Sequence, residues 1–352
     1  MNNYLTYLYL LTPLHTGGSA NEGNLMGIAR EVHTEFPYLP ASSLRGKIRA
    51  ELEAEYADAA AKFFGQKIKD GQQPTEGEVW FADATLLFFP IASLSHHLVW
   101  ITCPLWLERW NRWIGDGEIA KLIAQCNDIL KDDEPADSEP LEKTTTDNKP
   151  VLNKPVPNKP NPPQPVDNKA SDNKSKSAIV SFETEELYLQ TAILTKPNLE
   201  KINFQYFLNQ LQELLKDNSL ISNLGKKLIV LTDEDCAALV EIGLQREVRV
   251  ALEEESKTVK GGSFRSEEAI PPEAVLFFPW GIKPPKKFEI DTEKTDQQNQ
   301  EEKIKKDKTD TEIRQEIQNK LNKQKLQFGG LESLGRGWAE LRTVVNTINQ
   351  DR

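Results

Sequence analysis

The distribution of apolar positions along the 352-residue chain predicts a mixture of strands and helices. Alternating or short apolar runs predict strands over residues 3–11, 78–89, 98–102, 179–182, 227–231, 246–252, 274–279 and 339–345. Apolar residues that recur every three or four positions predict helices over residues 42–64, 105–114, 204–215 and 233–244. We expect an irregularity at Asp83 inside the second strand. The pattern therefore favours an α+β fold.

Two stretches depart from this pattern. Residues 131–177 contain Asn-Lys-Pro three times, at 148, 153 and 158, and almost no large apolar residue, which is typical of a disordered insertion. Residues 291–325 are highly charged, and the narrow stripe of Ile313, Ile317 and Leu321 predicts one amphipathic helix late in the tract. The chain therefore divides into folded parts over 1–130, 178–290 and 326–352, separated by the two insertions.

One polar, glycine-containing loop leads into a predicted helix start. Residues 12–49 pass from the first strand through Gly17-Gly18 to Ser42, Ser43 and Arg45, with Lys47 and Arg49 close behind. We expect Ser42 or Ser43 to cap the helix, and free N–H groups beside cations suit a phosphate. A second glycine-rich loop begins at Gly329-Gly330 and continues to Gly335-Arg336-Gly337, which resembles a phosphate-binding nest.

Charge and cysteine content limit the possible functions. The net charge of −11 argues against nonspecific coating of nucleic acid. However, residues 183–255 hold fourteen acidic and seven basic residues, so the acidity is concentrated away from residues 12–49. No apolar run is long enough to cross a membrane, and three separated cysteines without a CxxC spacing favour a cytoplasmic protein without a disulfide framework or structural zinc site.

Candidate catalytic residues are few. His15 follows the first strand and is a candidate general base or phosphate ligand, although a packing role explains it equally well. No histidine has metal-ligand spacing, and no motif of a nucleotide-binding loop or hydrolase is present. Trp106, Trp110 and Trp113 recur at helical spacing and are expected in the core, with base stacking as the alternative.

Five motifs, in this order, resemble one known family. They read TPLHTGG, AREVHTEFPYLPASSLRGKIR, ADATLLFFPIASLSHHLVWITCPLWLERW, RVALEEESKTVKGGSFRSEEAIPPEAVLFF and FGGLESLGRGW. The chain is similar in these motifs to the RAMP proteins of CRISPR effectors, and in particular to the backbone subunit of type III-B (Cmr) complexes. The resemblance covers most of the chain outside the two insertions.

The resemblance implies an RRM-like (ferredoxin-like) palm with a finger region and a long thumb hairpin. It implies partners as well: a guide crRNA, a complementary target RNA, further copies of the chain and other type III subunits. Copies would stack along the guide while each thumb displaces a nucleotide of the guide–target duplex. The RNA-binding residues that it implies are Ser42, Ser43, Arg45, Lys257, Thr258, Val259, Gly329, Gly330, Gly335, Arg336 and Gly337. The neighbouring cations Arg30, Lys47 and Arg49 are further RNA-binding candidates.

The sequence departs from the family's cutting members at one position. Those members carry an aspartate a few residues before an IQRE-like sequence, and here Leu25 or Asn24 stands at that position. Neither side chain ionises to hold Mg²⁺, so no cofactor is expected unless cleavage is retained. We expect a non-catalytic RNA-binding subunit. The alternatives are a metal-dependent target-RNA endoribonuclease using Glu22 with His15, and a metal-free crRNA-processing nuclease using His15.

Overall fold

A computed structural model describes most of the chain outside the two predicted insertions. The described residues are 2–18, 21–22, 25–66, 75–131, 176–215, 218–251, 253, 256, 258, 264–284, 310–322 and 325–346. The predicted disordered insertion lies outside them except at its edges, as does most of the second insertion before residue 310.

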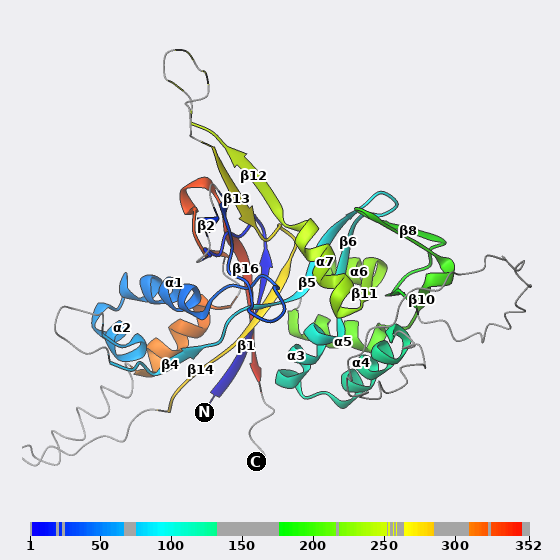
Figure 1. Cartoon of the computed structure of the whole chain (residues 1–352). Coiled ribbons are helices and arrows are strands. Elements are labelled where there is room, and N and C mark those ends of the chain that lie inside the picture. Colours follow the sequence, from blue (N-terminus) through cyan, green and yellow to red (C-terminus); the bar gives the residue numbers. More distant parts are fainter. Residues whose placement is uncertain are drawn as a thin grey trace, which may run out of the picture.

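A large central sheet organises the described part of the chain (Figure 1). β1 lies between β14 and β16 and runs antiparallel to both, so Leu8 is opposite Leu276 on one side and Leu341 on the other. In sheet order the strands are β10 (Leu199–Lys201), β7 (Ala178–Val180), β11 (Leu228–Leu231), β6 (His97–Thr102), β5 (Thr85–Ser93), β14 (Val275–Ile282), β1 (Asn2–Leu10), β16 (Trp338–Asn346) and β15 (Lys325–Gln327), with β4 (Val79–Phe81) paired to β14. The sheet together with its helices confirms the α+β class.

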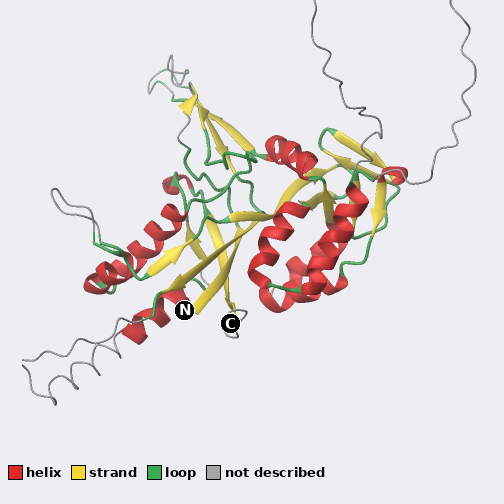
Figure 2. Cartoon of the chain, turned by 60° about the horizontal axis from the view of Figure 1, so that its bottom comes forward, coloured by secondary structure: helices red, strands yellow, loops and turns green. Residues whose placement is uncertain are grey.

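Helices lie on both sides of this sheet, in two groups (Figure 2). One group contains α1 (Ala41–Glu53), α2 (Ala57–Phe64) and a helix over residues 310–320. The other contains α3 (Pro104–Ile114), α4 (Gly117–Leu130), α5 (Gln205–Leu215) and α6 (Asn218–Lys227). A further helix, α7 (Asp233–Gly243), connects β11 to β12 near the middle of the molecule.

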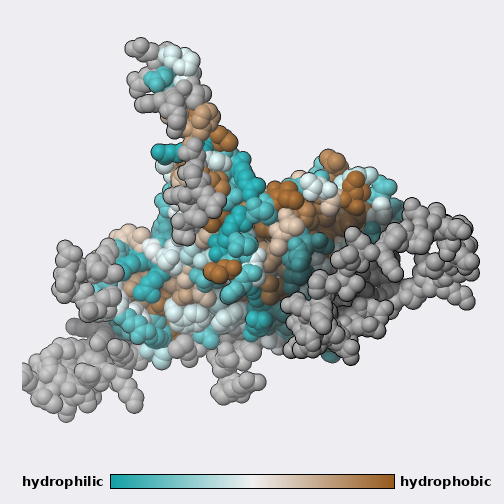
Figure 3. Space-filling view, in the orientation of Figure 1, coloured by the Kyte–Doolittle hydropathy of each residue, from teal (hydrophilic) through white to brown (hydrophobic). Residues whose placement is uncertain are grey.

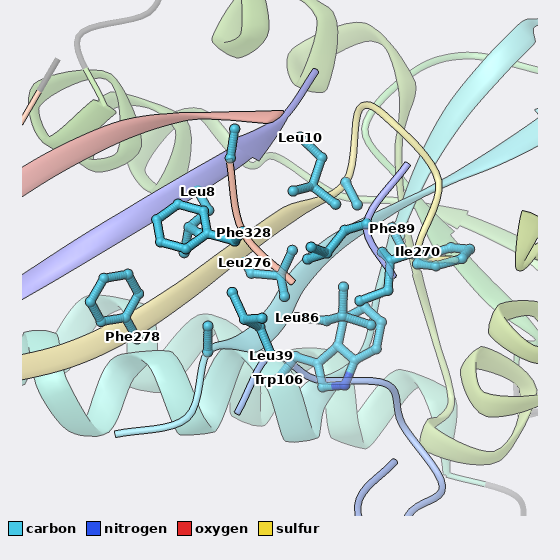
Figure 4. Packing of buried hydrophobic residues seen from close by; sticks show 14 of the residues in the cluster. Leu8, Leu10, Leu39, Leu86, Phe89, Trp106, Ile270, Leu276, Phe278 and Phe328 are labelled. Carbon is cyan, nitrogen blue, oxygen red and sulfur yellow. The ribbon is translucent and has the colours of Figure 1, made fainter. Parts of the chain in front are cut away.

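The alternation predicted for the first strand explains why both faces of the sheet are covered. Leu8 and Leu10 of β1 pack in one core cluster with Phe278 and Phe328 (Figure 4). Leu5 and Tyr7 point to the other face, where they join a second cluster. Each face buries its own apolar set, so the sheet needs a helical layer on each side.

The three tryptophans predicted at helical spacing lie on α3, in the helical group that also contains α4, α5 and α6. Trp106 and Trp110 are fully buried, and Trp110 donates a hydrogen bond from Nε1 to the Tyr7 hydroxyl at 2.8 Å. Trp113 is partly exposed and lies 6.4 Å from the Trp80 ring. The first two rings therefore serve the core, as the sequence predicted.

A smaller sheet projects from the centre of the molecule (Figure 1). β12 (Gln245–Arg249) and β13 (Arg265–Ala269) form an antiparallel hairpin, and β3 (Leu25–Met26) and β2 (Asn21–Glu22) extend it. Residues 246–252 and 274–279 were both predicted as strands, but they are not partners in this hairpin. The second belongs to β14 of the central sheet, and β12 pairs instead with β13, where Arg265 is opposite Arg249. The polar sequence RSEEA gave no strand pattern.

Other differences are local. The helix predicted over residues 42–64 is two helices, α1 and α2, and Gly65 ends the second with φ +75°. The strand predicted over 78–89 is also two strands, separated at the expected irregularity around Asp83. The short elements β8 (Glu186–Leu189), β9 (Ala192–Thr195), η1 (Lys196–Asn198) and η2 (Glu332–Leu334) were not predicted. Within the described residues no helix is long and apolar enough to span a membrane.

Candidate nucleic-acid interface

The start of α1 differs from its sequence prediction. Its N-cap position is Pro40, not Ser42 or Ser43, and no side chain of the cap residue bonds the helix. Instead, Oδ1 of Asp83 accepts a hydrogen bond from the Ala41 N–H at 2.7 Å. A carboxylate therefore already stabilises this helix end, and Ser42 lies exposed in the first turn.

Arg45, the central cation of the predicted phosphate grip, is tied to the protein backbone. Its guanidinium donates to the carbonyl oxygens of Phe64 and, at 3.4 Å, of Val79. It also lies 5.9 Å from the centre of the Phe64 ring. Arg45 therefore connects α1 to the end of α2 and to β4.

The other two cations of α1 have helical partners. Lys47 lies 2.9 Å from Glu51, and Arg49 lies 2.8 Å from Glu53, both one turn further along. Such partly exposed pairs are weak, so both cations remain able to meet a phosphate at the surface.

The two glycine-containing loops predicted from the sequence lie against each other. The Gly330 N–H donates to the His15 carbonyl, and the Gly337 N–H donates to the Pro13 carbonyl, each at 2.8 Å. Gly329 and Gly337 both have φ +80°, and an added Cβ would lie 2.3 Å and 1.8 Å from the carbonyl oxygens of His15 and Phe328, respectively. Glycine is required at both positions by backbone conformation and by space.

His15 is part of this contact and is buried. Its Nδ1 is 2.8 Å from the Glu268 carbonyl oxygen. A ring held in this way between β13 and the second glycine loop fits the packing role better than that of an exposed base.

On and beside the β12–β13 hairpin, four arginines and four glutamates form two sets of ion pairs, which together we call the arginine–glutamate network. Its members are Arg30, Arg246, Arg249, Arg336, Glu241, Glu247, Glu267 and Glu268. Arg30 and Arg336 come from the two predicted loop regions. The remaining six come from α7, β12 and β13. The network therefore joins α7 and the two loop regions to the hairpin.

Two consecutive glutamates of β13 divide the network. Successive residues of a strand point to opposite faces, so Glu267 and Glu268 receive different arginines. Glu268 is 3.2 Å from Arg30 and 3.0 Å from Arg246. Glu267 is 2.9 Å from Arg249 and 3.8 Å from Arg336. Both carboxylates are buried, which requires such pairing.

Two further glutamates complete the network nearer the solvent. Glu241 pairs with Arg30 at 2.6 Å and with Arg246, while Glu247 pairs with Arg336 at 2.5 Å and with Arg249 at 3.4 Å. The Arg336 guanidinium lowers the pKa of the Glu247 carboxyl below its usual value. Glu247 is therefore ionised at neutral pH.

A pocket of about 540 Å³ opens beside the Arg30 half of the network. Leu25, Ile28, Phe36 and Val240 contribute to its apolar wall. Arg30, Thr34, Glu241, Arg246 and Glu268 supply its polar groups. Its volume and mixed lining suit a base or a ribose–phosphate unit.

The loop that carries the family's aspartate position forms strands in this chain. Glu22 of β2 pairs directly with Leu25 of β3, and β3 pairs in parallel with β13. Glu22 is thus adjacent to Leu25 across a hairpin, closer than the three-residue separation in sequence implies. Asn24 lies outside the described residues.

Two of the described carboxylates near Leu25 are unsuited to a Mg²⁺ site. Glu241 and Glu268, which line the pocket beside it, are each paired with two arginines. No group of three His, Cys, Asp or Glu able to hold a metal occurs in the part of the chain that the structure describes.

The tip of the hairpin is only partly described. Lys257 and Val259 lie outside the described residues, whereas Thr258 is exposed and its carbonyl accepts from the Glu253 N–H at 2.9 Å. Exposed apolar side chains occur along the hairpin at Val248, Val250 and Phe264. Figure 3 shows hydrophobic patches on the projecting part of the molecule.

Sequence reasoning missed most of the network. The alternation of Arg246, Glu247 and Arg249 predicts a strand but not their ion pairs, and no periodic pattern marks Glu267 and Glu268 as buried. Consecutive acidic residues near the start of an apolar run were the available sign, because buried carboxylates require cationic partners.

Comparison with known proteins places this geometry in a family. A curated relative named "CRISPR system Cmr endoribonuclease Cmr4", from Pyrococcus furiosus, is 27% identical over 352 residues, which cover 98% of each chain. A crystal structure of oligomeric Cmr4 from the same organism matches with a TM-score of 0.56 at 20% identity, covering 98% of each chain.

A chain of the type III-B Cmr-beta complex bound to cognate target RNA matches with a TM-score of 0.59 at 20% identity, over 97% of this chain and 96% of that one. These structural matches show a shared fold. The sequence model of the RAMP superfamily matches residues 7–340, nearly the whole chain. The chain described here therefore belongs to the RAMP superfamily.

Proposed function

We propose that this protein is the crRNA-binding backbone subunit of a type III-B CRISPR effector complex. Copies of the chain stack along the guide RNA in the cytoplasm, together with other subunits of the complex. The β12–β13 hairpin, with Val248, Val250 and Phe264 exposed, inserts into the guide–target duplex and displaces a nucleotide. The names of the Cmr relatives support this proposal.

The observation that carries the proposal is the contact between two loops at the base of the hairpin. Residues 13–16 and the glycine loop at 329–337 are joined by backbone hydrogen bonds and bring Arg30 and Arg336 to the base of the hairpin. Backbone N–H groups and arginines recognise phosphates without regard to sequence. A guide of arbitrary sequence requires this kind of contact.

Binding of a labelled guide-length RNA to the purified chain tests the proposal. We expect Arg336→Gln to weaken binding about tenfold or more, since a lost arginine–phosphate contact removes roughly 1.4 kcal/mol or more. Arg112→Gln is the matched control, because Arg112 is exposed on α3 beside Glu108 and outside the network.

Arg336→Gln also leaves Glu267 with one cation fewer, so a folding defect must be separated from a binding defect. The double variant Arg336→Gln/Glu267→Gln removes both charges together. We expect it to bind RNA as weakly as the single variant while unfolding nearer to the native temperature. Native affinity in both variants refutes the assignment of Arg336.

A second candidate function is target-RNA cleavage using Glu22. It is favoured by the backbone pairing of Glu22 with Leu25, the position of the family's aspartate, and by the endoribonuclease name of the Pyrococcus furiosus relative. Incubation of the assembled complex with complementary RNA in Mg²⁺ buffer distinguishes the two functions. Regularly spaced fragments that disappear in Glu22→Gln would establish cleavage, and intact target RNA would support a binding-only subunit.

The third reading, metal-free guide processing by His15, has little support. The ring is buried and its Nδ1 is held by the Glu268 carbonyl. A general base must reach the hydroxyl that it deprotonates.

A further inference from the structure

The arginine–glutamate network is neutral by charge count. Arg30 and Arg246 face Glu241 and Glu268, and the other two arginines likewise face two glutamates. A neutral cluster attracts phosphate weakly, however many arginines it contains. If this surface binds RNA, at least one carboxylate must leave its arginine when a phosphate arrives.

The two carboxylates on Arg336 differ in how easily they are released. The Glu267 side chain is 6% exposed and the Glu247 side chain is 39% exposed. Breaking a buried ion pair leaves an unsolvated charge and costs several kcal/mol, about 3–5, whereas an exposed pair is worth only about 0–1 kcal/mol. Glu247 is therefore the carboxylate that separates from Arg336 more easily.

We propose that Glu247 occupies the anion position on Arg336 that a guide-RNA phosphate takes, so that RNA binding exchanges one anion for the other. This inference rests on the proposed function. Glu247 keeps the mostly buried Arg336 guanidinium paired in the free subunit, and the buried Glu267, 3.8 Å from Arg336, stays beside it during the exchange. The phosphate offers the same two-oxygen geometry to the guanidinium as the carboxylate.

The other half of the network repeats this design. Glu241 is 48% exposed and pairs with Arg30 and Arg246, while the side chain of Glu268 beneath it is 4% exposed. Glu241 belongs to the end of α7 and Glu247 to β12, so both exposed glutamates sit where the hairpin leaves the palm. When the guide binds, the exchange consequently breaks the ion pairs of Glu241 and Glu247 at the base of the hairpin.

The exchange also gives selectivity. A short or weakly held RNA must displace the carboxylates with few phosphates, whereas a guide lying along the whole surface contributes many contacts. The glutamates therefore raise the threshold for binding of unrelated RNA, in agreement with the acidic character of the chain.

The test compares Glu247→Gln with Glu185→Gln in the full-length chain. Glutamine keeps the size of the side chain and removes its charge. Glu185 serves as the control because it also forms an ion pair, with Lys196, but lies beside the exposed β8–β9 strands and outside the network. Filter binding of a labelled single-stranded RNA of guide length, at fixed salt, gives the dissociation constants.

We expect Glu247→Gln to bind RNA about three to ten times more tightly than Glu185→Gln, which corresponds to about 0.7–1.4 kcal/mol at 1.4 kcal/mol per tenfold. Glu241→Gln is also expected to tighten RNA binding. The double variant Glu241→Gln/Glu247→Gln should bind RNA more tightly than either single variant. Thermal unfolding of each variant establishes that the fold is retained.

Equal or weaker binding by Glu247→Gln, with the native chain binding RNA, overturns the exchange and leaves the proposed function standing. Absence of RNA binding by the native chain and by every variant overturns both. Tighter binding by Glu185→Gln and Glu247→Gln to the same degree shows a general charge effect and also overturns the exchange.

Discussion

Gly337 and Gly335 provide a matched pair of positions in the glycine loop. Both have a left-handed backbone, with φ +80° and +75°. An added Cβ at Gly337 would lie 1.8 Å from the Phe328 carbonyl oxygen, whereas at Gly335 it would meet nothing within 4 Å. The two alanine substitutions therefore share backbone strain and differ in steric overlap.

The structure sets the size of the difference. Left-handed backbone costs an alanine about 1–2 kcal/mol at either position. At Gly337 the overlap forces the loop away from Phe328, and overpacking of this kind adds about 1–3 kcal/mol or more. We expect Gly335→Ala to lower the free energy of unfolding by about 1 kcal/mol. We expect Gly337→Ala to lower it by about 3 kcal/mol and to weaken guide RNA binding, because Arg336 moves with the loop.

Urea denaturation followed by circular dichroism measures the stability, and filter binding with guide-length RNA measures the function. Similar losses of stability for the two variants would refute the packing of the glycine loop against Phe328. Native RNA affinity in Gly337→Ala, at a temperature where it is folded, would refute the role of this loop in holding the guide.

Three further predictions concern other parts of the fold. Asp83→Ala should lower the free energy of unfolding by about 1 kcal/mol through loss of the α1 cap. Ser42→Ala should leave the free energy of unfolding unchanged within about 0.5 kcal/mol. An equal effect of both substitutions in urea denaturation would contradict the capping geometry. Arg45→Lys should cost about 1–3 kcal/mol, because lysine lacks the planar fork that reaches two carbonyl groups, and a thermal unfolding curve matching that of Arg112→Lys would argue against this role. Burial raises the pKa of the Cys126 thiol to about 12 and also raises the pKa of Cys103, so alkylation of native protein by iodoacetamide at pH 8 should be very slow, and rapid labelling without urea would contradict their burial.

Local patterns predicted most of the regular elements. The first strand, the tryptophan helix, α7 and the closing strand all appear close to their expected bounds, because their apolar residues have a clear period. α4 was missed although Ile119, Ile123, Cys126 and Leu130 have helical spacing and Asp116 caps it.

The candidate site was predictable only in part. Both glycine-containing loops were predicted, but the contact between them, made through the backbone of His15 and Gly330, was not. The partners of the arginines were not predicted either, since Arg45 binds carbonyl groups and Arg336 binds glutamates that lie 89 and 69 positions away in sequence. Ion pairs between distant residues leave no periodic pattern in a sequence.

The central claim is that copies of this chain line up along a guide RNA. Native mass spectrometry of the purified chain mixed with single-stranded RNAs of increasing length tests it most directly. The account predicts complexes in which the number of protein copies rises in regular steps with RNA length, and in which Arg336→Gln lowers that number. One copy per RNA at every length, or oligomers whose size is independent of the RNA, would contradict it.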